Sequence, residues 1–146
     1  MILLKSDIAK RQIDTACELF LNGGDFLSVV TLAGAAEEIL GNLLKRGNKK
    51  NIMDSLVELD LRLTGGRPFK DVSAEVNAAR NALKHAREAS EDSVAVLPRE
   101  AHAMLSRAIA NYVLLTDDVS DSMLLVYQRL MGGFLFGGGY DTGWQP

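Results

Sequence analysis

The sequence contains little of what several common protein classes require. Its 146 residues include one cysteine, Cys17, which excludes a disulfide framework and favours a reducing cytoplasm. There are only two histidines, and no set of Cys, His and carboxylate residues has the spacing of a zinc site, so we expect no metal and no cofactor. The net charge of −3 lacks the basic excess of a general nucleic-acid binder. Any contact with RNA should therefore be local.

Long apolar runs are also missing near the start of the chain. The run Met1–Leu4 ends at Lys5 and is far too short for a signal peptide or a membrane span, so we expect no membrane association. The composition, 47% hydrophobic and 24% charged, is ordinary for a globular protein. Leu and Ala are abundant and there are only three prolines, which favours helices over strands.

Apolar residues at three-and-four spacing predict an all-α fold, an antiparallel helical bundle of five to six helices with no sheet. Gly23-Gly24 should end the first helix, Asp25 and Asn51 should cap the second and third, and Pro98 suits the first turn of the fifth. The first helix is expected to start near residue 6 or 7, the second to run to about Arg46, and the third to follow Asn51 and end before Gly65-Gly66. Pro68 and Asp71 should open a fourth helix that reaches about Ala86, and the fifth begins at about Pro98. A sixth segment, 121–131, either continues the fifth helix or bends from it.

The bundle is expected to occupy residues 1–131, and the character of the chain changes in residues 132–146. This C-terminal tail alternates six glycines with Phe134, Phe136, Tyr140 and Trp144. Glycine opposes regular structure, whereas aromatic side chains favour burial. The tail is therefore either a flexible end or a segment that docks on the bundle or on a partner.

Glu37 is out of place on the second helix. At 100° per residue it falls in the middle of a stripe formed by Phe26, Val30, Ala33, Leu40 and Leu44. A buried carboxylate is costly unless it is paired or protonated, so Glu37 should bond to a donor from another helix, and Arg80 is the favoured candidate. The alternatives are a satisfied core polar group with no further role, or a partly exposed stripe.

The predicted fourth helix carries a second polar group of residues. Arg80 lies at the edge of its apolar stripe, while Asn81 and His85, four residues apart, share the opposite face with Ala74 and Ala78. Small residues beside polar ones indicate a face that another helix can approach closely, and so a homodimer. Simple solvent exposure explains Asn81 and His85 equally well.

The segment Arg80-Asn81-Ala82-Leu83-Lys84-His85 resembles the signature of the HEPN family of small helical bundles. That signature is an arginine, usually followed by a polar residue, with a histidine four to six residues on. The order of helices is also similar, with the motif on a late helix and an acidic residue on an earlier one. The resemblance covers roughly residues 7–131.

The resemblance implies a metal-independent endoribonuclease, often of toxin or defence type, that dimerises so that two motifs face one cleft. By position, His85 would be the general acid or base, Arg80 would stabilise charge on the transition state, and Asn81 would orient the phosphate or the histidine. Other members are inactive and bind nucleotides or protein partners. In toxins paired with a nucleotidyltransferase antitoxin, a tyrosine two residues past the histidine is modified, and Arg87 stands at that position here.

A basic cluster, defined by Lys45, Arg46, Lys49 and Lys50, lies in the turn after the second helix. It could contact an RNA backbone by neutralising phosphates, or it is an ordinary solvated turn. The sequence thus favours a HEPN-like ribonuclease. The alternatives are an inactive module that binds a nucleotide or protein, and a structural bundle in which the motif is a coincidence. These alternatives differ in whether Arg80 and His85 open to one concave surface.

Overall fold

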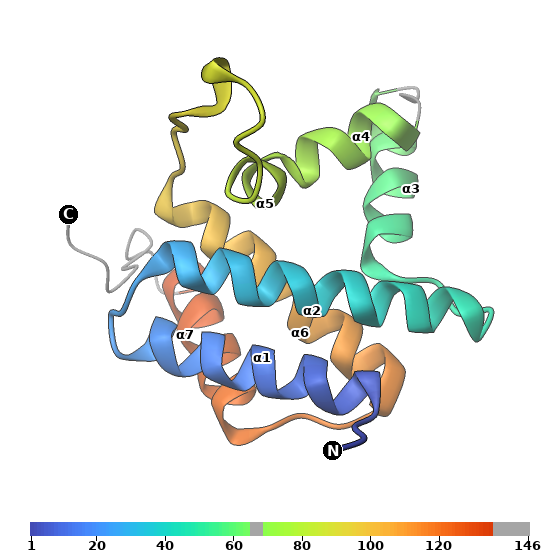
Figure 1. The fold of residues 1–146 in the computed structure, drawn as a ribbon. Coiled ribbons are helices and arrows are strands. Elements are labelled where there is room, and N and C mark those ends of the chain that lie inside the picture. Colours follow the sequence, from blue (N-terminus) through green and yellow to red (C-terminus); the bar gives the residue numbers. More distant parts are fainter. Residues whose placement is uncertain (65–68, 136–146) are drawn as a thin grey trace.

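The computed structural model describes residues 1–64 and 69–135, and in these ranges it is helical without a strand (Figure 1). The predicted all-α helical bundle is therefore confirmed. The helices are α1 Lys5–Leu21, α2 Phe26–Arg46, α3 Ile52–Thr64, α4 Phe69–Val76, α5 Ala78–Ala82, α6 Pro98–Thr116 and α7 Asp121–Leu135, with a short 3₁₀ turn, η1, at Ala89–Glu91.

Most helix ends lie where their capping chemistry predicts. The Asp25 carboxylate accepts hydrogen bonds from the backbone N–H groups of Leu27 and Ser28, at 3.3 and 3.0 Å. Asn51 Oδ1 accepts from the N–H of Asp54 at 2.9 Å, and Pro98 is the first residue of α6. These side chains satisfy N–H groups that a helix start leaves without an internal partner.

The core lies where α2 packs against α1 on one side and α6 on another, with α7 packed mainly on α1 (Figure 1). Its largest buried side chains include Phe20, Ile13, Leu40, Leu44, Met104, Leu105 and Met123. Helix α2 is long and apolar enough to span a membrane by length and composition alone. Half of that apolar stretch is buried inside the bundle, so core packing accounts for its apolar character.

The predicted fourth helix is wrong in detail. Asn77 adopts a turn conformation, φ −99° and ψ 5°, which separates α4 from α5, and α5 ends at Ala82 rather than near residue 86. His85 therefore lies beyond the helix, and Ala74 and Ala78 belong to different helices. The break adds a helix to the expected five or six, because tertiary contacts at residue 77 override a continuous helical pattern.

The C-terminal part of the chain is only partly covered by the structure. Helix α7 continues through Leu135, beyond the expected end at residue 131. The remaining tail residues, 136–146, lie outside the described residues, so the choice between a flexible end and a docking segment stays a prediction.

Candidate functional site

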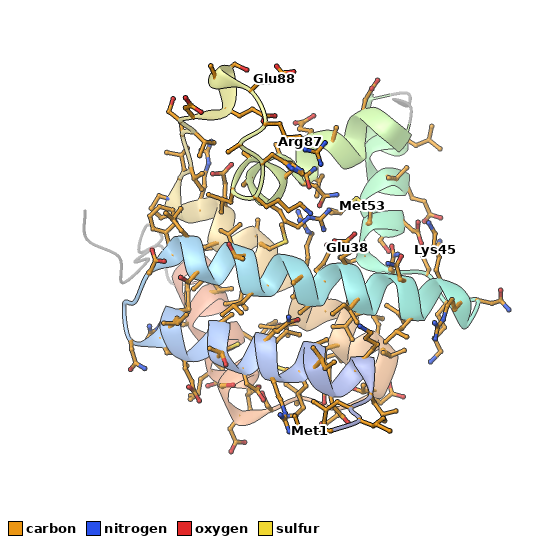
Figure 2. The ribbon with its side chains drawn as sticks, in the orientation of Figure 1. Met1, Glu38, Lys45, Met53, Arg87 and Glu88 are labelled. Atoms are coloured by element: carbon orange, nitrogen blue, oxygen red, sulfur yellow. The ribbon has the colours of Figure 1, made fainter. Side chains whose placement is uncertain are left out.

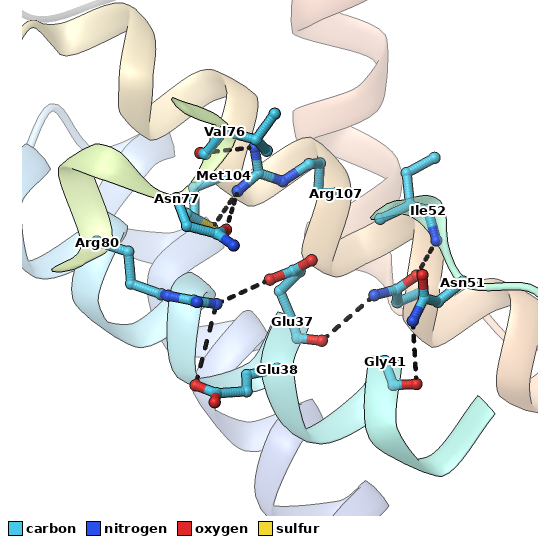
Figure 3. Close-up of polar contacts among 11 residues, drawn as sticks. Glu37, Glu38, Gly41, Asn51, Ile52, Val76, Asn77, Arg80, Met104 and Arg107 are labelled. Atoms are coloured by element: carbon cyan, nitrogen blue, oxygen red, sulfur yellow. Dashed lines mark hydrogen bonds and ion pairs between the residues drawn. The ribbon is translucent and has the colours of Figure 1, made fainter. Parts of the chain in front are cut away.

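Glu37 and Arg80 form an ion pair between α2 and α5. Arg80 Nη1 donates to Glu37 Oε2 at 3.1 Å, and Glu38 Oε2 lies 3.9 Å from the same nitrogen (Figure 3). Glu37 is 4% exposed and the Arg80 side chain 13%. The predicted burial of Glu37 and its predicted partner are both confirmed. Burial raises the pKa of Glu37, while the positive charges of Arg107 and Arg80 act in the opposite direction.

Gly34 makes room for the arginine on α2. A Cβ atom at this position would lie 2.7 Å from both Cγ and Cδ of Arg80, closer than carbon atoms normally approach. Gly34 and Glu37 are three residues apart and share a face of α2. The Arg80 stem therefore crosses α2 over the glycine, and its guanidinium reaches the carboxylate one turn further along.

A second arginine, Arg107 of α6, holds the break between α4 and α5. Its Nη1 donates to the backbone carbonyl of Val76 at 3.2 Å, and its Nη2 approaches Asn77 Oδ1 at 3.4 Å and Met104 Sδ at 3.1 Å (Figure 3). The Val76 carbonyl ends α4, so this bond satisfies an acceptor that the interrupted helix leaves without a helical partner. Burial lowers the pKa of Arg107, Glu37 opposes that change, and the charge of Arg80 adds to it.

Buried amides extend this polar region to α3. Asn111 Nδ2 donates to the Glu37 carbonyl at 3.3 Å, and Asn111 Oδ1 accepts from the N–H of Ile52 at 2.9 Å. Asn51 Nδ2 donates to the Gly41 carbonyl at 3.2 Å. The inter-helix polar region is defined here by Glu37, Asn51, Asn77, Arg80, Arg107 and Asn111. It joins α2 to α3, α5 and α6.

Asn81, on α5, and His85, beyond the end of that helix, are not part of this region. Together with Ser90, Glu91, Ser93 and Val94 they line an open hollow of about 300 Å³, called here the His85 hollow. Arg80 is not among the lining residues. Within one chain, therefore, the histidine and asparagine of the motif share a concave surface, whereas the arginine faces Glu37.

The basic cluster is separate from this hollow. Lys45, Lys49 and Lys50 line a surface depression at the end of α2 together with Asp54 and Glu58, and Lys50 forms an ion pair with Glu58. Arg46 is exposed next to it. In Figure 2, Lys45 lies at the C-terminal end of α2, well away from Glu88 on the loop after α5. Cations at a helix C-terminus also complement its dipole, so the cluster has a structural role without RNA.

Sequence reasoning missed Asn77, Arg107 and Asn111. Asn111 carried a usable signal, because it falls seven residues after Met104 and three after Ala108, on the apolar stripe of α6. Arg107 and Asn77 carried no such signal. Arg107 donates to a backbone carbonyl, and that carbonyl lacks a helical partner only because the fold breaks the helix at Asn77. In the part of the chain that the structure describes, no three Cys, His, Asp or Glu residues cluster as a metal site would.

Comparisons with models of protein families, with curated proteins and with solved structures found no match to this chain. The HEPN family therefore stays a resemblance carried by the motif of residues 80–85 and by the helical context.

Proposed function

We propose that this chain is a HEPN-like, metal-independent endoribonuclease that acts as a homodimer. The observation that supports the proposal best is the His85 hollow, in which the motif histidine and asparagine lie together at the surface. Imidazole exchanges protons near neutral pH, and an amide offers both a donor and an acceptor. The hollow thus brings a proton carrier and an orienting group to one open site.

In the proposed reaction the ribose 2′-oxygen attacks the adjacent phosphorus and the bond from phosphorus to the 5′-oxygen breaks. His85 takes the proton of the 2′-hydroxyl as a general base. The leaving 5′-oxygen takes up a proton, either returned by the imidazole or donated by water. The products are a 2′,3′-cyclic phosphate and a free 5′-hydroxyl. Asn81 orients the phosphate or the imidazole ring.

Arg80 would stabilise the negative charge that develops on the phosphorane-like transition state. Its bond to buried Glu37 fixes the stem, and its Nη1 lies 3.1 Å from Glu37 Oε2 and 3.9 Å from Oε2 of the exposed Glu38. Because Arg80 does not line the His85 hollow, the proposal requires a dimer in which the arginine of one protomer approaches the hollow of the other.

The proposed dimer interface includes α4 and α5, where Ala74 and Ala78 are exposed and small enough for close packing. Light scattering at tens of micromolar, an order-of-magnitude range for a modest interface, should give the mass of a dimer. A monomer at that concentration would count against the shared site. A toxin or defence role, a protein antitoxin as partner, a cytoplasmic location and RNA backbone contact by the basic cluster belong to the same proposal.

One observation favours a second candidate, an inactive helical module that binds a nucleotide or a protein partner. Two carboxylates face Arg80 Nη1, and the side chain is only 13% exposed. A guanidinium that is neutralised and covered in this way offers less charge to a phosphate than a free one. Under this candidate the inter-helix polar region only stabilises the fold, and the His85 hollow binds a ligand without cleaving it.

The test is incubation of the purified chain with bulk RNA in EDTA, alongside His85→Ala. Lys84→Ala is the matched control, since Lys84 is the exposed neighbour of His85 and does not line the hollow. The proposal predicts cyclic phosphate ends from wild type and the control, and a loss of cleavage of about 10²-fold or more in His85→Ala. Cleavage that survives in His85→Ala refutes it. If the wild type does not cleave RNA but binds a nucleotide or RNA with an affinity that depends on Arg80, the inactive module is the better description.

A further inference from the structure

The chemistry of the His85 hollow points to a particular kind of ligand group. One wall comes from the end of α5 and the residues after it, which supply Asn81, Ala82 and His85, and the other from the loop that contains η1. The loop contributes two hydroxyl groups, a carboxylate and the methyl groups of Val94. Its volume of about 300 Å³ is at the small end of the range for ligand sites, which suits one base rather than a long strand.

Charge decides which part of a nucleotide fits inside. Glu91 is among the residues that line the hollow, and no Lys or Arg is among them. A phosphate would meet a like charge there and no fixed cation, whereas a neutral base with N–H donors would gain a charge-assisted hydrogen bond. Arg87 is exposed two residues after His85 in the chain, and it offers positive charge to a phosphate outside the hollow.

The Glu91 carboxylate is held in place by its own loop. Its Oε2 accepts hydrogen bonds from the N–H groups of Arg87, at 2.6 Å, and Glu88, at 3.3 Å, and Glu88 completes a reciprocal capping box around η1. These bonds occupy one oxygen and fix the plane of the carboxylate. Oε1 accepts neither of these bonds, and the carboxylate is held before any ligand arrives, which lowers the cost of binding.

We propose that the His85 hollow binds a guanine base, with Glu91 as the residue that selects it. Guanine presents adjacent imino and amino donors on its Watson–Crick edge, more than any other base offers to a single carboxylate. It also presents acceptors for the serine hydroxyls. Ala82 and Val94 contact its apolar faces. The inference rests on the proposed function in that the bound guanine would flank the phosphate that is cleaved.

Binding of the four nucleoside 5′-monophosphates to the full chain, followed by calorimetry and by the NMR shifts of His85, tests the inference without any cleavage. The guanine nucleotide should bind roughly tenfold more tightly than the uracil nucleotide, the ratio expected from one charge-assisted hydrogen bond. Glu91→Gln keeps an oxygen acceptor for the loop and should abolish the preference. Asp92→Asn is the matched control, because it removes the same charge from the same loop outside the lining of the hollow.

Equal affinity for all four nucleotides, no binding at millimolar concentration, or a guanine preference that survives in Glu91→Gln would each overturn the inference. Displacement of the guanine nucleotide by inorganic phosphate at equal concentration would also overturn it, because the hollow would then hold the phosphate. Cleavage of guanine-containing and guanine-free RNA separates the two proposals. RNA cleavage without guanine preference would refute this inference alone, whereas guanine binding without cleavage would refute only the ribonuclease.

Discussion

Helix α2 contacts its neighbours through two chemically different surfaces. On one surface its apolar side chains, such as Val29, Ala33 and Leu40, lie in the same buried cluster as Ile13 and Phe20 of α1. Toward α3 and α5 it presents Glu37 and two glycines, and the contacts there are hydrogen bonds and an ion pair. Hydrophobic burial is non-directional, whereas hydrogen bonds specify particular atoms. Of the motif residues, Arg80 is therefore placed by the polar surface.

The apolar surface should carry the larger share of stability, and Phe20→Ala tests this most strongly. Phe20 is fully buried and packs edge-on against His102, with ring centroids 5.2 Å apart. Its removal leaves a cavity and should lower the free energy of unfolding by about 3–5 kcal/mol. Urea denaturation measures the change. Leu125→Ala, at a residue 53% exposed, is the control and should stay within about 0.5 kcal/mol of wild type. A loss for Phe20→Ala no larger than the control's would contradict this account of the core.

Glu37→Ala is the corresponding test of the polar surface. It removes the acceptor of Arg80 and leaves buried donors without a partner, so the free energy of unfolding should fall by about 1–3 kcal/mol. Glu38→Ala is the matched control, because Glu38 is the adjacent carboxylate but its side chain is 55% exposed. We expect the control to leave the melting temperature almost unchanged. Equal melting temperatures for Glu37→Ala and wild type would show that the ion pair contributes nothing to folding.

Gly34→Ala tests whether the Arg80 stem depends on the glycine beneath it. In wild type the added methyl group would collide with Arg80, so the variant should be less stable by about 1 kcal/mol despite the higher helix propensity of alanine. In an Arg80→Ala background the collision is gone, and the same change should become stabilising by up to about 1 kcal/mol. A thermodynamic cycle of the four proteins measures this reversal. The same effect in both backgrounds would contradict the close approach.

The smallest expected effect on stability comes from protonation of His102, which is buried with the apolar surface. The side chain is buried beside Phe20, and burial lowers its pKa from the ordinary value of 6.5. The unfolded chain therefore binds a proton more readily than the folded one, so stability should fall as the pH drops below 6.5 toward the folded pKa. Urea titrations at pH 7.5 and 5.5 measure the loss, which should be reduced in His102→Gln. An unchanged pH dependence in that variant would assign the loss to other groups.

Much of the fold follows from the sequence because its signals are local. Asp25, Asn51 and Pro98 act on N–H groups within their own first turn, and apolar residues at helical spacing mark the face that will be buried. Glu37 was identifiable by the same periodicity, and Arg80 by its place at the edge of a stripe. The break at Asn77 was not identifiable, because Arg107, thirty residues later in the chain, is the group that satisfies the carbonyl it exposes.

The sequence by itself determined that this chain is an all-α bundle and that Glu37 needs a buried donor, because periodicity and desolvation act through spacing along one helix. Only the tertiary structure decided where the motif residues point. Residues 80–85 form a regular helix in the sequence pattern, yet α5 ends at Ala82, with Arg80 held on Glu37 and His85 turned into a hollow with the η1 loop. The position of Arg80 depends on a hydrogen bond to Glu37, 43 residues earlier in the chain, and only the folded chain brings the two helices together.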